Sequence, residues 1–153
     1  MNNENLSEMP IELSSYFGKG LKFWQYPNQL NLYLKQLSKY KINSYLEIGC
    51  RWGGTFIITT EFLKKTNQNV KGYACDINPI SDILTEYKNY SDFDYLHMSS
   101  FDLNRNIISN DIDLILIDGD HSYEGLKRDF ETSKQFNPKY ISFHDISSDV
   151  CPR

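Results

Sequence analysis

From residue 44 onward, short apolar runs alternate with segments of helical length. Near-continuous apolar runs are typical of strands buried on both faces, and strands that alternate with helices form a parallel sheet covered by helices. The sequence therefore predicts a doubly wound, Rossmann-like α/β fold. Its strands are expected at residues 44–48, 70–75, 95–98, 112–117 and 140–143, and its helices at 55–65, 80–87 and 123–136.

The residues before the first strand predict one further helix. Pro27 suits a first helical turn, and an apolar stripe follows at helical spacing in Leu30, Tyr33, Leu34 and Leu37. The aromatic run 23–26 is expected either to pack in the core or to form a lid or floor over a ligand. Residues 1–20 are polar and are expected to form an N-terminal arm, which leaves a single domain at 21–153.

Composition excludes several classes of protein. The chain has 16 Lys+Arg, 20 Asp+Glu and a net charge of −4, without the basic cluster that nucleic-acid binding requires. No apolar run approaches the roughly 20 residues of a membrane span, and the N-terminus has no secretory pattern. The three cysteines show no paired metal-binding spacing. We expect a cytoplasmic protein without nucleic-acid or membrane partners.

A glycine-rich loop follows the first predicted strand. It begins at Glu47, contains Gly49, Gly53 and Gly54, and has Arg51 where a dinucleotide fingerprint requires its second glycine. Such a loop lets a ligand approach the main chain and the N–H groups of the next helix. The spacing resembles the first motif of class I methyltransferases that use S-adenosylmethionine (SAM). An ordinary glycine-rich turn is the alternative.

Polar residues also follow the second and third predicted strands. Asp76 lies where a carboxylate accepts hydrogen bonds from both hydroxyls of a ribose, although it could instead cap the next helix. After the third strand, Ser99 or Ser100 could bind an adenine base, and Phe101 could cover its face. A loop capped by Asp102 is an equally good interpretation.

Carboxylates and imidazoles gather after the fourth and fifth predicted strands. Asp118, Asp120 and His121 crowd four positions, and His144 and Asp145 end the fifth strand. Imidazole titrates near neutrality, so His121 is a candidate general base. Asp118, His144 and Asp145 offer ligands that suit Mg²⁺ or Mn²⁺. Helix capping with a solvated acidic rim is the alternative.

Residues 20–152 resemble bacterial class I methyltransferases related to the metal-dependent sugar O-methyltransferases and the cephalosporin-hydroxylase-like proteins. The matching stretches are 24–29, 46–55, 118–125 and 143–146. The resemblance implies that Asp118 binds a divalent metal and that His121 deprotonates the acceptor hydroxyl. It also implies an acidic pair after the fifth strand, where this chain has His144 and Asp145.

The function implied is SAM-dependent O-methylation of a small polar acceptor, such as a sugar or glycan precursor, with Mg²⁺ or Mn²⁺ as a second cofactor. His121 and Asp118 are the expected catalytic residues. The expected SAM-binding residues are Glu47, Gly49, Arg51, Gly53, Gly54, Asp76, Ser99, Ser100, Phe101 and Asp118. A SAM-binding module without catalysis and a nucleotide-dependent oxidoreductase are the alternatives.

The C-terminal part of the sequence is shorter than the resemblance implies. The related proteins continue past the fifth strand and complete a seven-stranded sheet, whereas this sequence ends at Arg153. The fifth strand is therefore expected near a sheet edge with apolar side chains exposed, unless a second subunit covers it in a homo-oligomer.

Overall fold

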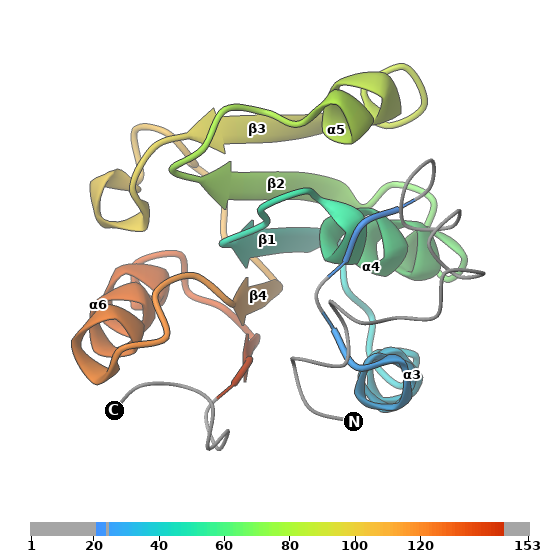
Figure 1. Ribbon diagram of the computed structural model, residues 1–153. Coiled ribbons are helices and arrows are strands. Elements are labelled where there is room, and N and C mark those ends of the chain that lie inside the picture. The colour runs from blue at the N-terminus through green and yellow to red at the C-terminus, as the bar shows by residue number, and fades with distance from the viewer. Residues whose placement is uncertain (1–20, 24, 146–153) are drawn as a thin grey trace.

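A computed structural model describes residues 21–23 and 25–145, and the predicted N-terminal arm lies outside this range (Figure 1). The described residues form one sheet with strand order β3-β2-β1-β4-β5, in which every neighbouring pair is parallel. The strands are β1 (Ser44–Ile48), β2 (Lys71–Asp76), β3 (Phe93–His97), β4 (Leu114–Ile117) and β5 (Tyr140–Phe143). The predicted α/β fold is confirmed, and the sheet within the described residues has no strand beyond β5.

The strand boundaries differ from the prediction by at most two residues at each end. The bounds of β1 and β5 agree with it, while β3 begins two residues earlier because the side chain of Phe93 is buried in the core. β4 begins two residues later than predicted. Asp113, just before it, accepts hydrogen bonds from the backbone and side chain of Asn43 and pairs with Lys139 at 2.8 Å.

The described residues form four α-helices, two of which begin at a serine cap. They are α3 (Pro27–Leu37), α4 (Gly54–Lys64), α5 (Asp82–Tyr87) and α6 (Tyr123–Lys134), with a 3-10 turn η1 (Ser100–Asp102). The Ser81 hydroxyl accepts from Leu84 N at the start of α5, and the Ser122 hydroxyl accepts from Gly125 N at the start of α6. Such caps satisfy N–H groups that a helix leaves without an internal partner.

Helices cover both faces of the sheet. Neighbouring strand residues point to opposite faces, so Tyr45 packs with Phe56 of α4 and Leu84 of α5, while Leu46 belongs to a second cluster with Phe136. The sequence predicted strands buried on both faces, but the edge strands β3 and β5 have partly exposed side chains. Phe143 in β5 is 37% exposed, as the edge position predicted.

The strand order reverses between β1 and β4, and this reversal determines where a ligand can bind. All the arrowheads that Figure 1 shows clearly, those of β1, β2 and β3, point the same way, so the carboxyl ends of the strands share one edge of the sheet. In open parallel sheets, ligands bind at this edge, in the crevice where the order reverses. The loops after β1 and β4 are therefore expected to flank a binding site.

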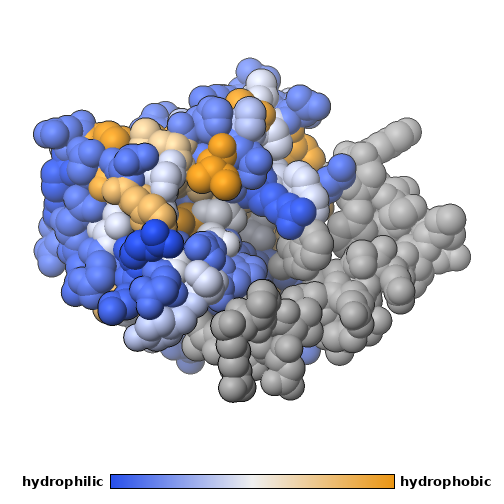
Figure 2. Space-filling view, turned by 60° about the vertical axis from the view of Figure 1, so that its left-hand side comes forward, coloured by the Kyte–Doolittle hydropathy of each residue, from blue (hydrophilic) through white to orange (hydrophobic). Residues whose placement is uncertain are grey.

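One face of the described surface is mostly polar. Figure 2 shows hydrophilic residues over much of one face, with hydrophobic residues in several separate areas. No helix within residues 21–23 and 25–145 is long and apolar enough to cross a bilayer.

Candidate active site

A cavity of about 790 Å³ lies at the carboxyl ends of the strands. Its volume falls in the range of small-molecule sites. Most residues predicted for cofactor, metal and catalysis line it, namely Glu47, Gly49, Arg51, Gly54, Asp76, Asp118, His121, His144 and Asp145. Polar residues that follow separate strands thus meet in one pocket.

Gly49 occupies the position where the loops after β1 and β4 meet. Its φ is +84°, and a Cβ added there would lie 2.2 Å from the backbone oxygen of Asp118. A side chain would therefore be strained by the backbone angle and would also collide with the neighbouring loop. Glycine at this position lets the two loops approach each other closely beside the cavity.

Asp76 connects the glycine loop to the loop after β2. Its Oδ2 accepts a hydrogen bond from Arg51 N at 2.6 Å, and its Oδ1 accepts from the backbone and side chain of Asn78, both at 2.8 Å. The alternative role as a plain helix cap is wrong, because Ser81 caps α5. Asp76 is 6% exposed and lines the cavity.

The residues after β3 do not line the cavity, and neither does Gly53. The Ser100 hydroxyl donates a short hydrogen bond to Asp129, a buried residue of α6. The Phe101 ring is 43% exposed and lies 4.2 Å from the Arg128 guanidinium carbon. Contacts of Ser99, Ser100 and Phe101 with an adenine base therefore stay a prediction.

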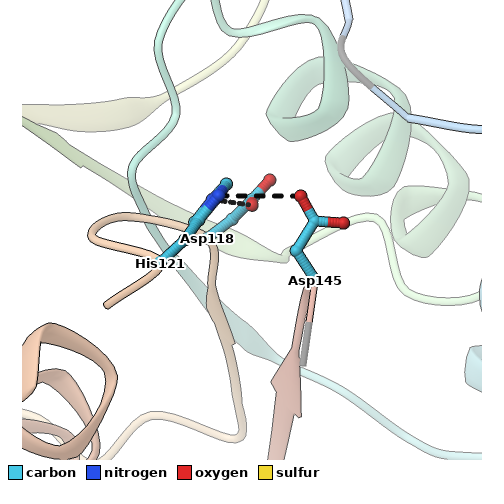
Figure 3. A group of neighbouring side chains, drawn as sticks. All are labelled: Asp118, His121 and Asp145. Carbon is cyan, nitrogen blue, oxygen red and sulfur yellow. Dashed lines mark hydrogen bonds and ion pairs between the residues drawn. The ribbon is translucent and has the colours of Figure 1, made fainter. Parts of the chain in front are cut away.

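Two carboxylates and an imidazole converge from β4 and β5 (Figure 3). Asp118 Oδ1 lies 3.2 Å from His121 Nε2, and Asp145 Oδ2 lies 3.6 Å from His121 Nδ1. One ligand atom from each of these residues falls within 4.8 Å of the others. Two oxygen donors and one imidazole nitrogen at this spacing fit a divalent cation such as Mg²⁺ or Mn²⁺.

His144 lies beside the same carboxylates. Its Nδ1 is 3.2 Å from Asp118 Oδ1 and 3.1 Å from Asp145 Oδ1, but neither ring nitrogen makes a well-formed hydrogen bond to a described residue. The side chain is 14% exposed, whereas that of His121 is 38% exposed. The structure thus provides two imidazoles, one more buried than the other, for one pair of carboxylates.

The charges of this cluster stabilise one another. The hydrogen bond to Asp118 raises the pKa of His121 above its usual value, although burial opposes it. Burial also opposes protonation of His144, but the contact with Asp118 outweighs it, and the pKa of His144 is raised. Burial alone would raise the pKa of Asp118, yet the two imidazoles lower it. Protons and a cation would therefore compete for this cluster.

The sequence model of a methyltransferase-domain family matches residues 46–146, about two thirds of the chain. The chain belongs to this methyltransferase family. The match begins in β1 and extends just past Asp145, so it includes the glycine loop, Asp76 and the carboxylate–imidazole cluster. No curated protein matches the chain.

Glu47 is the most deeply buried acid in the cavity wall of the methyltransferase. The residue is 1% exposed, and burial raises the pKa of its carboxyl group to about 8, although the hydrogen bond from the Tyr45 hydroxyl opposes this. Glu47 is therefore mainly neutral at pH 7. A ligand that brings positive charge beside it would favour the carboxylate and release a proton.

Replacing Glu47 by Gln is expected to stabilise the methyltransferase at alkaline pH. Between pH 4.5 and about 8 the unfolded chain loses the Glu47 proton while the folded chain keeps it, so wild-type stability falls as pH rises. The amide of the Glu47→Gln variant has no such proton to lose. The gain in free energy of unfolding should therefore grow from near zero at pH 4.5 to roughly 3–5 kcal/mol above pH 8.

Urea unfolding of both proteins at pH 5, 7 and 9 measures this difference. Glu86→Gln, an exposed change on α5, serves as the matched control and should show little dependence on pH. A constant difference between Glu47→Gln and wild type across this range would contradict the prediction.

Gln25 is a cavity residue of the methyltransferase that the sequence did not single out. Its Nε2 donates to Asp118 Oδ2 at 2.8 Å, and the residue is 5% exposed. Phe23 lines the cavity as well, which favours the lid-or-floor interpretation of the aromatic run for these two residues. One indication of this role is present in the sequence, because Gln25 is the single amide residue in the aromatic run just before the helix that begins at Pro27.

Proposed function

We propose that this methyltransferase transfers a methyl group from SAM to a hydroxyl oxygen of a small polar acceptor, with a sugar or glycan precursor as the acceptor class. One observation carries the proposal. A single cavity joins the glycine loop and Asp76 on one side to Asp118, His121 and Asp145 on the other. Methyl transfer needs both halves, one to hold a nucleoside donor and one to activate an acceptor.

The residues at the ends of β1 and β2 suit SAM. The Asp76 carboxylate accepts hydrogen bonds from Arg51 N and from the backbone and side chain of Asn78, and its remaining lone pair on Oδ2 can accept from a ribose hydroxyl. Asp118 places a carboxylate in the cavity, and Glu47 adds an acidic group that a positive charge would ionise, so a cationic ligand is favoured over a purely anionic one. SAM, when bound, supplies a methyl group on a sulfonium centre that the acceptor oxygen can attack.

Asp118, His144 and Asp145 are the proposed metal ligands, with His121 as the alternative to His144. Both imidazoles lie within reach of the carboxylates, but an imidazole that binds a cation cannot accept a proton at the same nitrogen. The deeper burial of His144 favours it as the ligand. A divalent cation, when bound, lowers the pKa of an acceptor hydroxyl and helps to orient it.

His121 is the proposed general base. Its imidazole is partly exposed in the cavity, so a proton taken from an acceptor hydroxyl can pass on to solvent. Asp118 orients the ring through Nε2 and stabilises the imidazolium that forms.

Calorimetry with SAM, followed by a methyl-transfer assay on hydroxylated acceptors, tests the proposal. SAM binding together with methylation of a sugar hydroxyl supports it. SAM binding without turnover on any acceptor would instead favour a binding module. Binding of NADH in the absence of SAM binding would favour an oxidoreductase.

Metal removal is expected to lower turnover by roughly tenfold or more, because a bound cation contributes several kcal/mol of charge stabilisation. EDTA treatment followed by addition of Mg²⁺ or Mn²⁺ measures this effect, and either ion should restore activity. Equal turnover before and after EDTA treatment, in protein shown by elemental analysis to be metal-free, would contradict the metal proposal and leave SAM binding untouched.

A further inference from the structure

We infer that Gln25 is a positioning residue that fixes the orientation of the Asp118 carboxylate, so that the active site extends to a residue upstream of the family match. The inference rests on the proposed function, because it assigns a role toward the proposed cation site. It starts from one contact, the hydrogen bond from Gln25 Nε2 to Asp118 Oδ2 at 2.8 Å, between residues 93 positions apart.

The two oxygens of Asp118 have different partners. Oδ1 lies 3.2 Å from His121 Nε2 and 3.2 Å from His144 Nδ1, whereas Oδ2 accepts from Gln25. A carboxylate only accepts hydrogen bonds, so the amide must present its NH₂ end to it. The contact therefore fixes the carboxylate plane and directs Oδ1 toward the imidazoles.

Gln25 is itself firmly held. On its C-terminal side, Tyr26 O accepts from Leu30 N at 2.9 Å as α3 begins. On its N-terminal side, the chain packs directly on the start of α4, where a Cβ added to Gly54 would lie 2.0 Å from Lys22 O. Described residues on both sides of Gln25 thus contact a helix. This is the kind of support that a partner of a metal ligand needs.

Burial explains why the contact matters. Gln25 is 5% exposed, and the Asp118 side chain is 14% exposed, so water cannot easily replace the amide as a donor. Without the donor, the carboxylate can rotate and share its oxygens differently between the imidazoles and a cation. Partners that orient metal ligands typically change metal affinity by about 10–100-fold when they are removed.

Gln25→Met separates this role from simple packing, because methionine keeps a similar shape and has no N–H donor. The full chain is titrated with Mn²⁺, followed by electron paramagnetic resonance, and the affinity for Mn²⁺ is expected to fall by about 10–100-fold. Gln29→Met, the same change at an exposed position of α3, should leave the affinity unchanged. Equal Mn²⁺ affinity in Gln25→Met and wild type, with both folded, would overturn the inference.

A second measurement needs no metal. In the metal-free wild-type protein, the side-chain amide protons of Gln25 should exchange slowly with solvent in NMR spectra, and Asp118→Ala should shift them and speed their exchange. Asp94→Ala, an exposed acid on β3, should leave them unchanged. Amide signals that do not respond to Asp118→Ala would overturn the inference even if Gln25→Met fails to fold.

The two measurements also separate this inference from the proposed function. Wild-type protein that binds no Mn²⁺ would refute the proposed metal site, and the amide signals of the metal-free protein would then decide whether Gln25 orients Asp118. If the wild-type protein binds Mn²⁺ and Gln25→Met binds it with the same affinity, only the role of Gln25 is refuted.

Discussion

Replacing His121 by Ala is expected to lower the turnover of methyl transfer by roughly 10²–10⁴-fold, the usual contribution of a general base. The imidazole lies between Asp118 and Asp145 at the cavity, and its substitution removes the proposed proton acceptor without touching the glycine loop or Asp76. SAM affinity should therefore change little. Steady-state kinetics and calorimetry on the same preparations measure the two effects separately.

The pH dependence of kcat/KM is an independent test of His121 as the general base. Only neutral imidazole accepts a proton, and the hydrogen bond to Asp118 raises the pKa of His121 above its usual 6.5 in the metal-free chain. Wild-type kcat/KM should therefore rise as pH rises through this region, and His121→Ala should lose that rise. Added imidazole should restore part of the activity of His121→Ala.

His144→Ala is the matched comparison for His121→Ala. If His144 is the ligand, its replacement weakens Mn²⁺ binding, whereas His121→Ala retains Mn²⁺ binding and loses turnover. If His121→Ala loses Mn²⁺ binding and His144→Ala keeps it, His121 is the metal ligand and His144 becomes the candidate base. Retained turnover in His121→Ala would remove this residue as the base.

Replacing Asp76 by Ala is expected to weaken SAM binding by roughly 10–10²-fold through the loss of a charge-assisted hydrogen bond to the ribose. The substitution also removes the acceptor for Arg51 N and for Asn78, so the loops after β1 and β2 lose one of the hydrogen bonds that connect them. Both effects act in the same direction. Calorimetric titration with SAM measures the combined loss.

Two further variants show where the loss originates. Asp76→Asn keeps the shape and one acceptor oxygen, so its affinity should fall between those of wild type and Asp76→Ala. Asp94→Ala removes an exposed acid that pairs with Lys71 on the neighbouring strand, a contact of small energetic value, and should bind SAM normally. Unchanged affinity in a folded Asp76→Ala protein would rule out the ribose contact.

The arrangement of the strands and the residues at their ends could be predicted because both follow local patterns. Apolar runs located β1 and β5 with their observed bounds, and parallel pairing then brings the residues after each strand to one edge. Asp76, Asp118 and Asp145 meet in one cavity for this reason. The pairing rule does not say how deeply each side chain is buried, so the more buried of the two histidines could not be identified.

Contacts between segments far apart in the chain could not be predicted from the sequence. Ser100 was a candidate for binding a base, yet its hydroxyl is hydrogen-bonded to Asp129 of α6. The cap of α5 proved to be Ser81, while Asp76 bridges two loops. Each of these outcomes depends on how a helix or loop packs against the sheet, and short-range spacing carries no information about that packing.

The sequence by itself determined a parallel α/β sheet with a glycine loop and a carboxylate–imidazole group at the strand ends, because continuous apolar runs along the chain indicate which segments are buried strands. The tertiary structure alone decided that Gln25 reaches Asp118 and that burial keeps Glu47 neutral at pH 7. These two features depend on distances and desolvation in three dimensions, which arise only when segments far apart in the chain pack together.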